Sequence, residues 1–88
     1  GYADLYLQGR IRAIPDIESE PIADCHRDFL RGLKVRANLV APILTDKGLW
    51  GLLIAHHCQA PRVWTPSDIN MMQTEAKNLA LAPSIRDI

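Results

Sequence analysis

The sequence lacks the features that mark several large classes of protein. Its longest apolar run, Leu49–Ala55, is far too short to cross a bilayer. Its 10 basic residues are balanced by 10 acidic residues, which leaves no positive excess for nucleic acid or an anionic membrane. Cys25 and Cys58 are its only cysteines, so no disulfide framework is expected. Gly1–Gln8 has no basic start followed by an apolar stretch, as a signal peptide would, and we therefore expect a cytoplasmic protein.

What is present is enough for one small folded domain. The chain has 88 residues, 48% of them hydrophobic, and no low-complexity run. A chain of this length buries only about 60–65% of the surface that it exposes when unfolded. We therefore expect a globular unit with a marginal core.

The first part of the chain predicts a strand and a short helix. Partial alternation over Arg10–Ile14 predicts a strand that Pro15 ends or places at an edge. A loop at Ile17–Ala23 follows, and Asp24 is expected to cap a helix of about two turns. The residues at helical spacing after this cap are Cys25, Phe29 and Leu33, with Leu30 beside them.

The second part predicts a hairpin and a longer helix. Ala37–Leu44 and Leu49–Ala55 predict antiparallel strands joined by a turn at Thr45–Gly48. Because the apolar residues of the second strand are continuous, we expect it to be buried on both faces. A loop at His56–Trp64 is followed by Thr65–Asp68, which has the pattern of a capping box with proline at the first helical position. The apolar stripe of this helix is Ile69, Met72, Ala76, Leu79 and Ala80.

Two prolines mark irregular points in this pattern. Pro42 predicts a bulge or an edge in the first hairpin strand, and Pro83 is expected to end or kink the last helix. The order of elements is strand, helix, strand, strand, helix. It predicts an α+β domain with an antiparallel sheet flanked by helices.

Reactive side chains gather at two places. Cys25 and His26 stand at the start of the first predicted helix, where the positive end of the helix dipole favours a thiolate. Cys25 also lies on the apolar stripe, so a simple core cysteine is the alternative. His26 is either a hydrogen-bond donor to a ligand or a surface histidine.

The second place is His56-His57-Cys58, after the second hairpin strand. Alternation points the two histidines to opposite faces, so at most one enters a given pocket, and Cys58 is expected to be packed. A zinc site or a cysteine–histidine hydrolase dyad would use these residue types. The chain has no Cys-x-x-Cys or His-x-x-x-His pair and no local hydrolase signature, which disfavours both.

Four blocks of sequence resemble the GAF domains of cyanobacteriochromes, which are relatives of phytochromes. The blocks are Cys25-His26, Val35–Ile43, Leu49–His56 and Pro61–Trp64, in the family's order and spacing from about residue 6 to residue 82. The resemblance implies an antiparallel sheet flanked by helices, with a linear tetrapyrrole (a bilin) in a cleft on one face. It also implies a further N-terminal region in a full domain, so residues 1–88 are expected to be a partial GAF domain.

The resemblance also implies roles for individual residues. Cys25 matches the cysteine that forms a thioether with the A-ring side chain of phycocyanobilin or a related bilin. His26 matches the neighbouring histidine that packs against the pyrrole rings, and either His56 or His57 is expected near the far end of the pigment. The further residues expected to contact the chromophore are Phe29 and Trp50. Arg10 and Arg12 are expected to be exposed strand arginines, with a contact to a propionate as the alternative.

The resemblance implies a photosensory module rather than an enzyme. Light isomerises the double bond between the C and D rings, and the change reaches a histidine kinase or chemotaxis-type output domain. The alternative is a pigment-free GAF domain that serves in regulation or dimerisation. We expect the chain to expose one sheet edge and half of the cleft, and therefore to fold stably only with the missing N-terminal part or by self-association.

Overall fold

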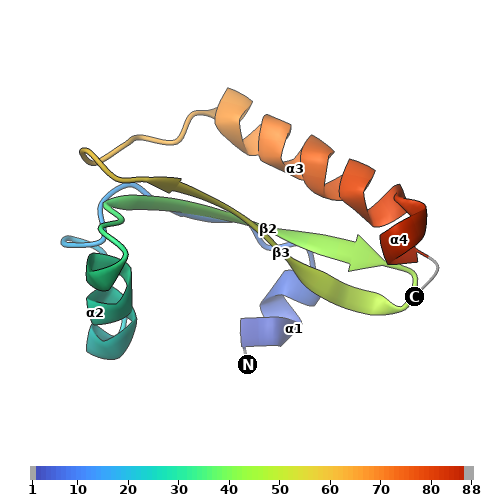
Figure 1. The fold of residues 1–88 in the computed structure, drawn as a ribbon, viewed down its shortest axis with the longest axis horizontal. Helices are drawn as coiled ribbons and strands as arrows, with labels where there is room; N and C mark the ends of the chain where they lie inside the picture. Colours follow the sequence, from blue (N-terminus) through green and yellow to red (C-terminus); the bar gives the residue numbers. More distant parts are fainter. Residues whose placement is uncertain (1, 87–88) are drawn as a thin grey trace.

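The computed structural model describes residues 2–86 and has helices on both faces of one antiparallel sheet, which confirms the predicted fold class (Figure 1). Helix α3 lies across one face of the sheet, and α1 and α2 lie on the other. The elements in chain order are α1 (Tyr2–Leu7), β1 (Arg12–Ile14), α2 (Asp24–Gly32), β2 (Ala37–Thr45), β3 (Gly48–His57), α3 (Pro66–Leu81) and α4 (Pro83–Arg86).

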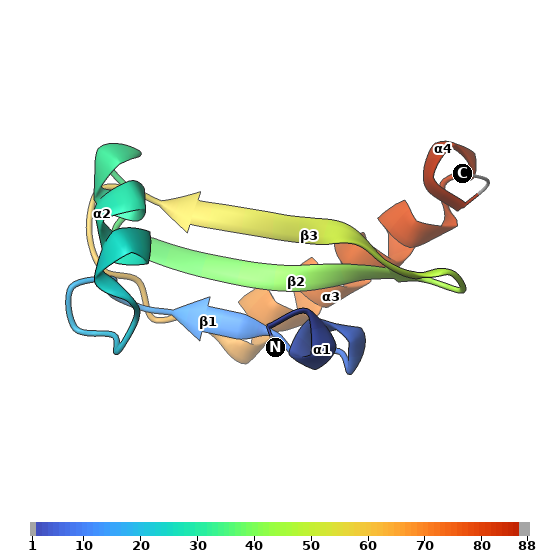
Figure 2. The ribbon, with the colours of Figure 1, turned by 90° about the horizontal axis from the view of Figure 1, so that it is seen from below.

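Within residues 2–86 the sheet has three strands in the order β1-β2-β3, and each hydrogen-bonded pair of neighbours is antiparallel (Figure 2). The register places Arg12 opposite Val40, and Val40 opposite Ile54. The predicted hairpin is confirmed: its turn ends at Gly48, whose φ of 115° is one that few other residues adopt.

Pro42 lies in the central strand rather than in an edge strand. It causes no break because β1 pairs with β2 only as far as Val40, so at Pro42 the strand has β3 as its one neighbour. The irregularity that the proline predicts occurs one residue later, as a register shift between Ile43 and Leu44.

The main core fills the space between α3 and the sheet. The α3 stripe is confirmed for Met72, Ala76 and Ala80, which are buried, whereas Leu79 at its margin stays exposed. The capping box is also confirmed, because the Thr65 hydroxyl accepts from the Asp68 backbone N–H (3.1 Å) and the Asp68 carboxylate accepts from the Thr65 N–H (2.9 Å). The strand residues of this cluster are Leu39, Ala41 and Ile43.

The chain after β3 returns to the end of β1. The Trp64 indole N–H donates to the Ile14 carbonyl at 3.0 Å, and the Arg62 backbone N–H donates to the Pro15 carbonyl at 2.9 Å. This segment therefore fastens the short strand β1 at the point where the loop toward α2 begins.

Strand β3 differs from its prediction in burial and in length. Its side chains alternate between half-buried and exposed, so it is not buried on both faces. The reason is that α3 covers one face of the hairpin while Leu52 (40% exposed) and Ile54 (49% exposed) lie on the other. The strand also continues through His56 and His57, which were expected in a loop.

Helix α2 is present as predicted, but its start and its exposed side differ from expectation. Ala23 is the N-cap residue and offers no side-chain hydrogen bond, while Asp24 is already helical and pairs with Arg27. Leu30 is the residue of α2 that enters the small second core, with Ile14, Ile17 and Val35. Cys25 and Phe29 are exposed, so Cys25 is not a core cysteine.

Candidate functional site

An open cleft lies on the face of the sheet that α3 does not cover. It consists of two hollows of about 340 and 380 Å³, which share Tyr6, Arg12 and His26 as lining residues. Each volume falls at the lower end of the range for ligand pockets, about 300–1,000 Å³. The first hollow is completed by Ile22, Ala23 and Cys25. The second is completed by Phe29, Leu30, Leu33, Asn38, Val40, Leu52, Ile54 and His56.

Strand register explains why these residues share one floor. Residues opposite each other in an antiparallel pair point to the same face, and this applies to Arg12, Val40 and Ile54. It applies equally to Asn38 and His56. The sheet therefore supplies a floor of aliphatic side chains with polar groups at one end.

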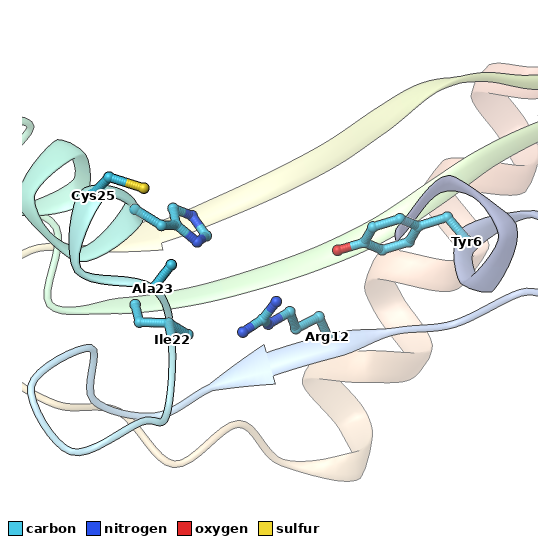
Figure 3. A pocket seen from close by; sticks show the side chains of 6 residues that line it. Tyr6, Arg12, Ile22, Ala23 and Cys25 are labelled. Carbon is cyan, nitrogen blue, oxygen red and sulfur yellow. The ribbon is translucent and has the colours of Figure 1, made fainter. Parts of the chain in front are cut away.

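Cys25 stands at the edge of this floor, on the first turn of α2. Figure 3 shows Cys25 entering from α2, Arg12 from β1 and Tyr6 from α1, with their polar ends directed toward the same hollow. The thiol is free and exposed. It is therefore accessible to a ligand that lies along the sheet.

The polar groups of the first hollow are left for a ligand to use. Among residues 2–86, neither the Arg12 guanidinium nor the Tyr6 hydroxyl has a hydrogen-bond or ion-pair partner. Arg10 behaves differently, because its guanidinium stacks 5.8 Å from the centre of the Tyr6 ring. Of the two β1-region arginines, Arg12 is thus the one placed to meet an anionic group.

Four of the six predicted site residues lie in the cleft: Cys25, His26, Phe29 and His56. His57 points to the opposite side of the strand, as alternation predicted, and its Nδ1–H donates to the Ala60 carbonyl at 2.9 Å.

Trp50, the remaining predicted residue, lines a separate hollow of about 140 Å³ near the hairpin turn. Cys58, expected to be packed, is exposed. It lies just beyond β3 and does not line the cleft.

The sequence reasoning missed other residues that line the cleft. Leu52 and Ile54 carry a signal that went unused, since they alternate with His56 along β3. Asn38 follows from the register once the hairpin is aligned, because it pairs with His56. Tyr6 had no such signal because α1 was not predicted.

Ion pairs link the loop before α2 to Arg36 and to Arg31 of α2. The Arg36 side chain donates two hydrogen bonds to the Asp16 carboxylate (2.7 and 3.1 Å), and this lowers the pKa of Asp16. The hydrogen bond from Arg31 likewise lowers the pKa of Glu18. These residues are therefore charged and paired at neutral pH.

Two further kinds of site are not found in the part of the chain that the structure describes. No group of three or more His, Cys, Asp or Glu side chains is arranged to hold a metal ion there. No helix between residues 2 and 86 is long and apolar enough to cross a membrane.

Comparison with protein families and known sequences identifies a matching family model and several relatives. Residues 1–82 match the model of the GAF domain. An uncharacterised protein of Picosynechococcus sp. is 51% identical over 90% of this chain and 48% of its own length. The circadian input-output histidine kinase CikA of Synechocystis sp. is 43% identical over 92% of this chain and 11% of its own length. A putative methyl-accepting chemotaxis protein of Synechocystis sp. is 39% identical over 99% of this chain and 9% of its own length.

Solved structures give the same grouping. The blue-light-absorbing form of the PixJ GAF domain of Thermosynechococcus elongatus has a TM-score of 0.86 and 44% identity, over 91% of this chain and 48% of that one. The cyanobacteriochrome TePixJ GAF domain has a TM-score of 0.87 and 45% identity, over 91% and 50%. The chain thus spans about half the length of these structures. Its structural neighbours are cyanobacteriochrome GAF domains, and the chain belongs to the GAF domain family.

Proposed function

We propose that this chain is the pigment-bearing part of a photosensory GAF domain, with Cys25 as the attachment residue for a linear tetrapyrrole. The observation that carries the proposal is the exposed Cys25 thiol at the edge of an open apolar cleft. The light-absorbing PixJ relatives support it, because they share this fold at more than 40% identity.

The residues of the cleft fit such a pigment. A flat conjugated molecule needs an apolar surface with a few fixed polar groups. Val40, Leu52 and Ile54 supply the surface. His26 and Arg12 supply polar groups beside Cys25, at the other end from the hairpin turn.

Each residue has a distinct role in the proposal. The Cys25 sulfur adds to a carbon–carbon double bond of the A-ring side chain, and the thiol proton goes to the adjacent carbon, so the addition needs no oxidant. Arg12 pairs with a propionate, because its guanidinium has no partner among residues 2–86. His26 packs beside the rings, and His56 meets the pigment at the end of β3.

The pigment supplies the light-driven isomerisation, and the chain supplies the tether and the orientation. Phycocyanobilin is the pigment used in the test below. The two isomers shift a conformational equilibrium only through different contacts with the protein. A histidine kinase or chemotaxis-type output in the same cytoplasmic protein is proposed because CikA and the chemotaxis protein are relatives. The chain itself has a sensory rather than an enzymatic role.

The test is to express the chain together with enzymes that make phycocyanobilin, and to look for zinc-enhanced fluorescence on the denatured protein band. We expect covalent pigment on the wild type and on Cys58→Ala, and none on Cys25→Ala. Cys58 is the matched control because it is also free and exposed. An unpigmented wild type would refute attachment, and a pigmented Cys25→Ala variant would refute the residue.

A second candidate function is a pigment-free GAF module whose open face binds protein. It is favoured by β3, which among residues 2–86 is paired on one side only and exposes Leu52 and Ile54. We propose that either the rest of a GAF domain or a second copy of the chain covers this face. Sedimentation of the 88-residue chain is expected to show self-association, and a monodisperse monomer with a cooperative melt would contradict it.

A further inference from the structure

One arginine of α2, Arg27, binds the loop between β1 and α2 through the loop's backbone carbonyls. This loop runs from residue 15 to residue 23, and its last two residues, Ile22 and Ala23, line the hollow beside Cys25. Arg27 Nε donates to the Ile17 carbonyl at 2.9 Å, and its Nη2 donates to the Glu20 carbonyl at 2.7 Å. The position of the loop therefore depends on a side chain from the helix that follows it.

The Arg27 side chain is largely enclosed by these contacts. It is 18% exposed, and its third hydrogen bond goes from Nη1 to an Asp24 carboxylate that is 94% exposed. An exposed ion pair of that kind contributes little. The two backbone carbonyls are the important partners, because removal of the guanidinium leaves them without this hydrogen-bond donor in a partly buried environment.

The start of α2 has no side-chain N-cap. Its N-cap residue, Ala23, cannot accept a hydrogen bond through its side chain. Arg27 follows Cys25 by two residues, which is about 200° around an α-helix. One face of the first turn is thus tied to the loop while the opposite face carries Cys25.

We infer that Arg27 is a positioning residue for pigment attachment: it fixes the first turn of α2 against residues 17–20 and so holds the Cys25 sulfur at the edge of the cleft. This rests on the proposed function of Cys25. A planar guanidinium can serve two carbonyls and a carboxylate at once, whereas a lysine ammonium has a single nitrogen for all three.

Arg31 provides a matched comparison on the same helix. It also reaches the loop, but it does so through the Glu18 carboxylate, and its side chain is 51% exposed. It makes no hydrogen bond to a loop carbonyl in the described part of the chain. Its substitution removes a loop-to-helix ion pair while leaving the Arg27 contacts in place.

The first test measures the rate at which the purified 88-residue chain attaches phycocyanobilin, in a Cys58→Ala background. Arg27→Gln is expected to slow attachment at least tenfold, since misplacement of a reacting group by about 1 Å can cost on the order of a hundredfold. Arg27→Lys is expected to be intermediate, and Arg31→Gln to stay within about twofold of the parent. Non-covalent pigment uptake and far-UV circular dichroism are expected to change little in all three.

The second test does not depend on pigment. Backbone amide exchange in residues 17–26 of the unpigmented chain is expected to accelerate in Arg27→Gln and not in Arg31→Gln. If the wild type does not attach pigment, the proposed function is refuted. The exchange result alone then tests whether Arg27 fixes the first turn of α2. Unchanged exchange, or attachment by Arg27→Gln at the parent rate, would overturn the inference. If Arg27→Gln does not fold, Arg27→Lys decides by the same two readouts.

Discussion

The two faces of the β2–β3 hairpin are both apolar, yet only one is closed. On the α3 face Leu39 is 1% exposed and packs among helix residues. On the other face Leu52 and Ile54 remain 40% and 49% exposed. The difference separates two uses of apolar side chains: the closed face stabilises the fold, and the open face is available for a ligand or a partner.

The largest expected effect tests the closed face. Leu39→Ala is expected to lower the free energy of unfolding by about 2–5 kcal/mol, because it removes a buried side chain and leaves a cavity. Leu52→Ala is the counterpart on the open face, with an expected loss below about 1 kcal/mol. Urea denaturation followed by circular dichroism measures both. Equal losses would mean that the open face is also part of the folding core.

The next prediction tests the open face by its effect on pigment attachment rather than on stability. Ile54→Lys places a charge on the cleft floor and is expected to reduce covalent pigment several-fold, because the charge opposes an apolar ligand. Its free energy of unfolding is expected to change by no more than about 0.5 kcal/mol. Val63→Lys, at an exposed position outside the cleft, is the control and is expected to keep full pigment. Equal loss in both variants would refute a role for the floor.

A smaller effect is expected at the start of the helix that closes the first face. Thr65→Ala removes the hydroxyl that accepts from the Asp68 N–H and is expected to cost about 1 kcal/mol of unfolding free energy. Ser67→Ala lies in the same turn without a capping role and is expected to cost less than about 0.5 kcal/mol. Thermal unfolding distinguishes them. A Ser67→Ala loss as large as that of Thr65→Ala would show that the cap has no special weight.

The smallest effect concerns pH on the α2 side of the sheet. Hydrogen bonds from Arg36, and then from the Glu18 N–H, lower the pKa of Asp16 in the folded chain below its unfolded value. The resulting stability is present above the unfolded pKa and is lost as pH falls through the folded pKa. Urea unfolding at several pH values between 7 and 3 is expected to show the wild type losing its advantage over Asp16→Asn at the acidic end. A difference that does not change with pH would contradict this linkage.

Local patterns in the sequence predicted much of the fold. The Thr65–Asp68 box, the turn before Gly48 and the helix that carries Cys25 are each encoded within a few residues, and the structure contains all three. Burial was harder to predict. The run 49–55 looks buried on both sides, but whether a strand face is covered depends on an element packed there, which the strand's own residues do not encode.

The candidate site shows the same division. Residue type and position marked Cys25, His26 and His56, the resemblance to a family implied their roles, and the structure places them around one cleft. Arg12, rather than Arg10, lines it because Arg12 lies within β1, whereas Arg10 precedes the strand and its guanidinium stacks on the Tyr6 ring. Register and packing bring together residues that are far apart in sequence, and a short sequence pattern does not encode these contacts.

The hydrogen bond from Trp64 to the Ile14 carbonyl bears on the order in which the molecule assembles. It joins positions 50 residues apart, and β1 itself contributes just three paired residues to the sheet. Contacts of such separation form late, because the intervening chain must first be ordered. The hairpin and α3 are thus expected to come together before β1 is secured. The loop that positions Cys25 begins at the end of β1, so the cleft side of the molecule is expected to be the last part to fold.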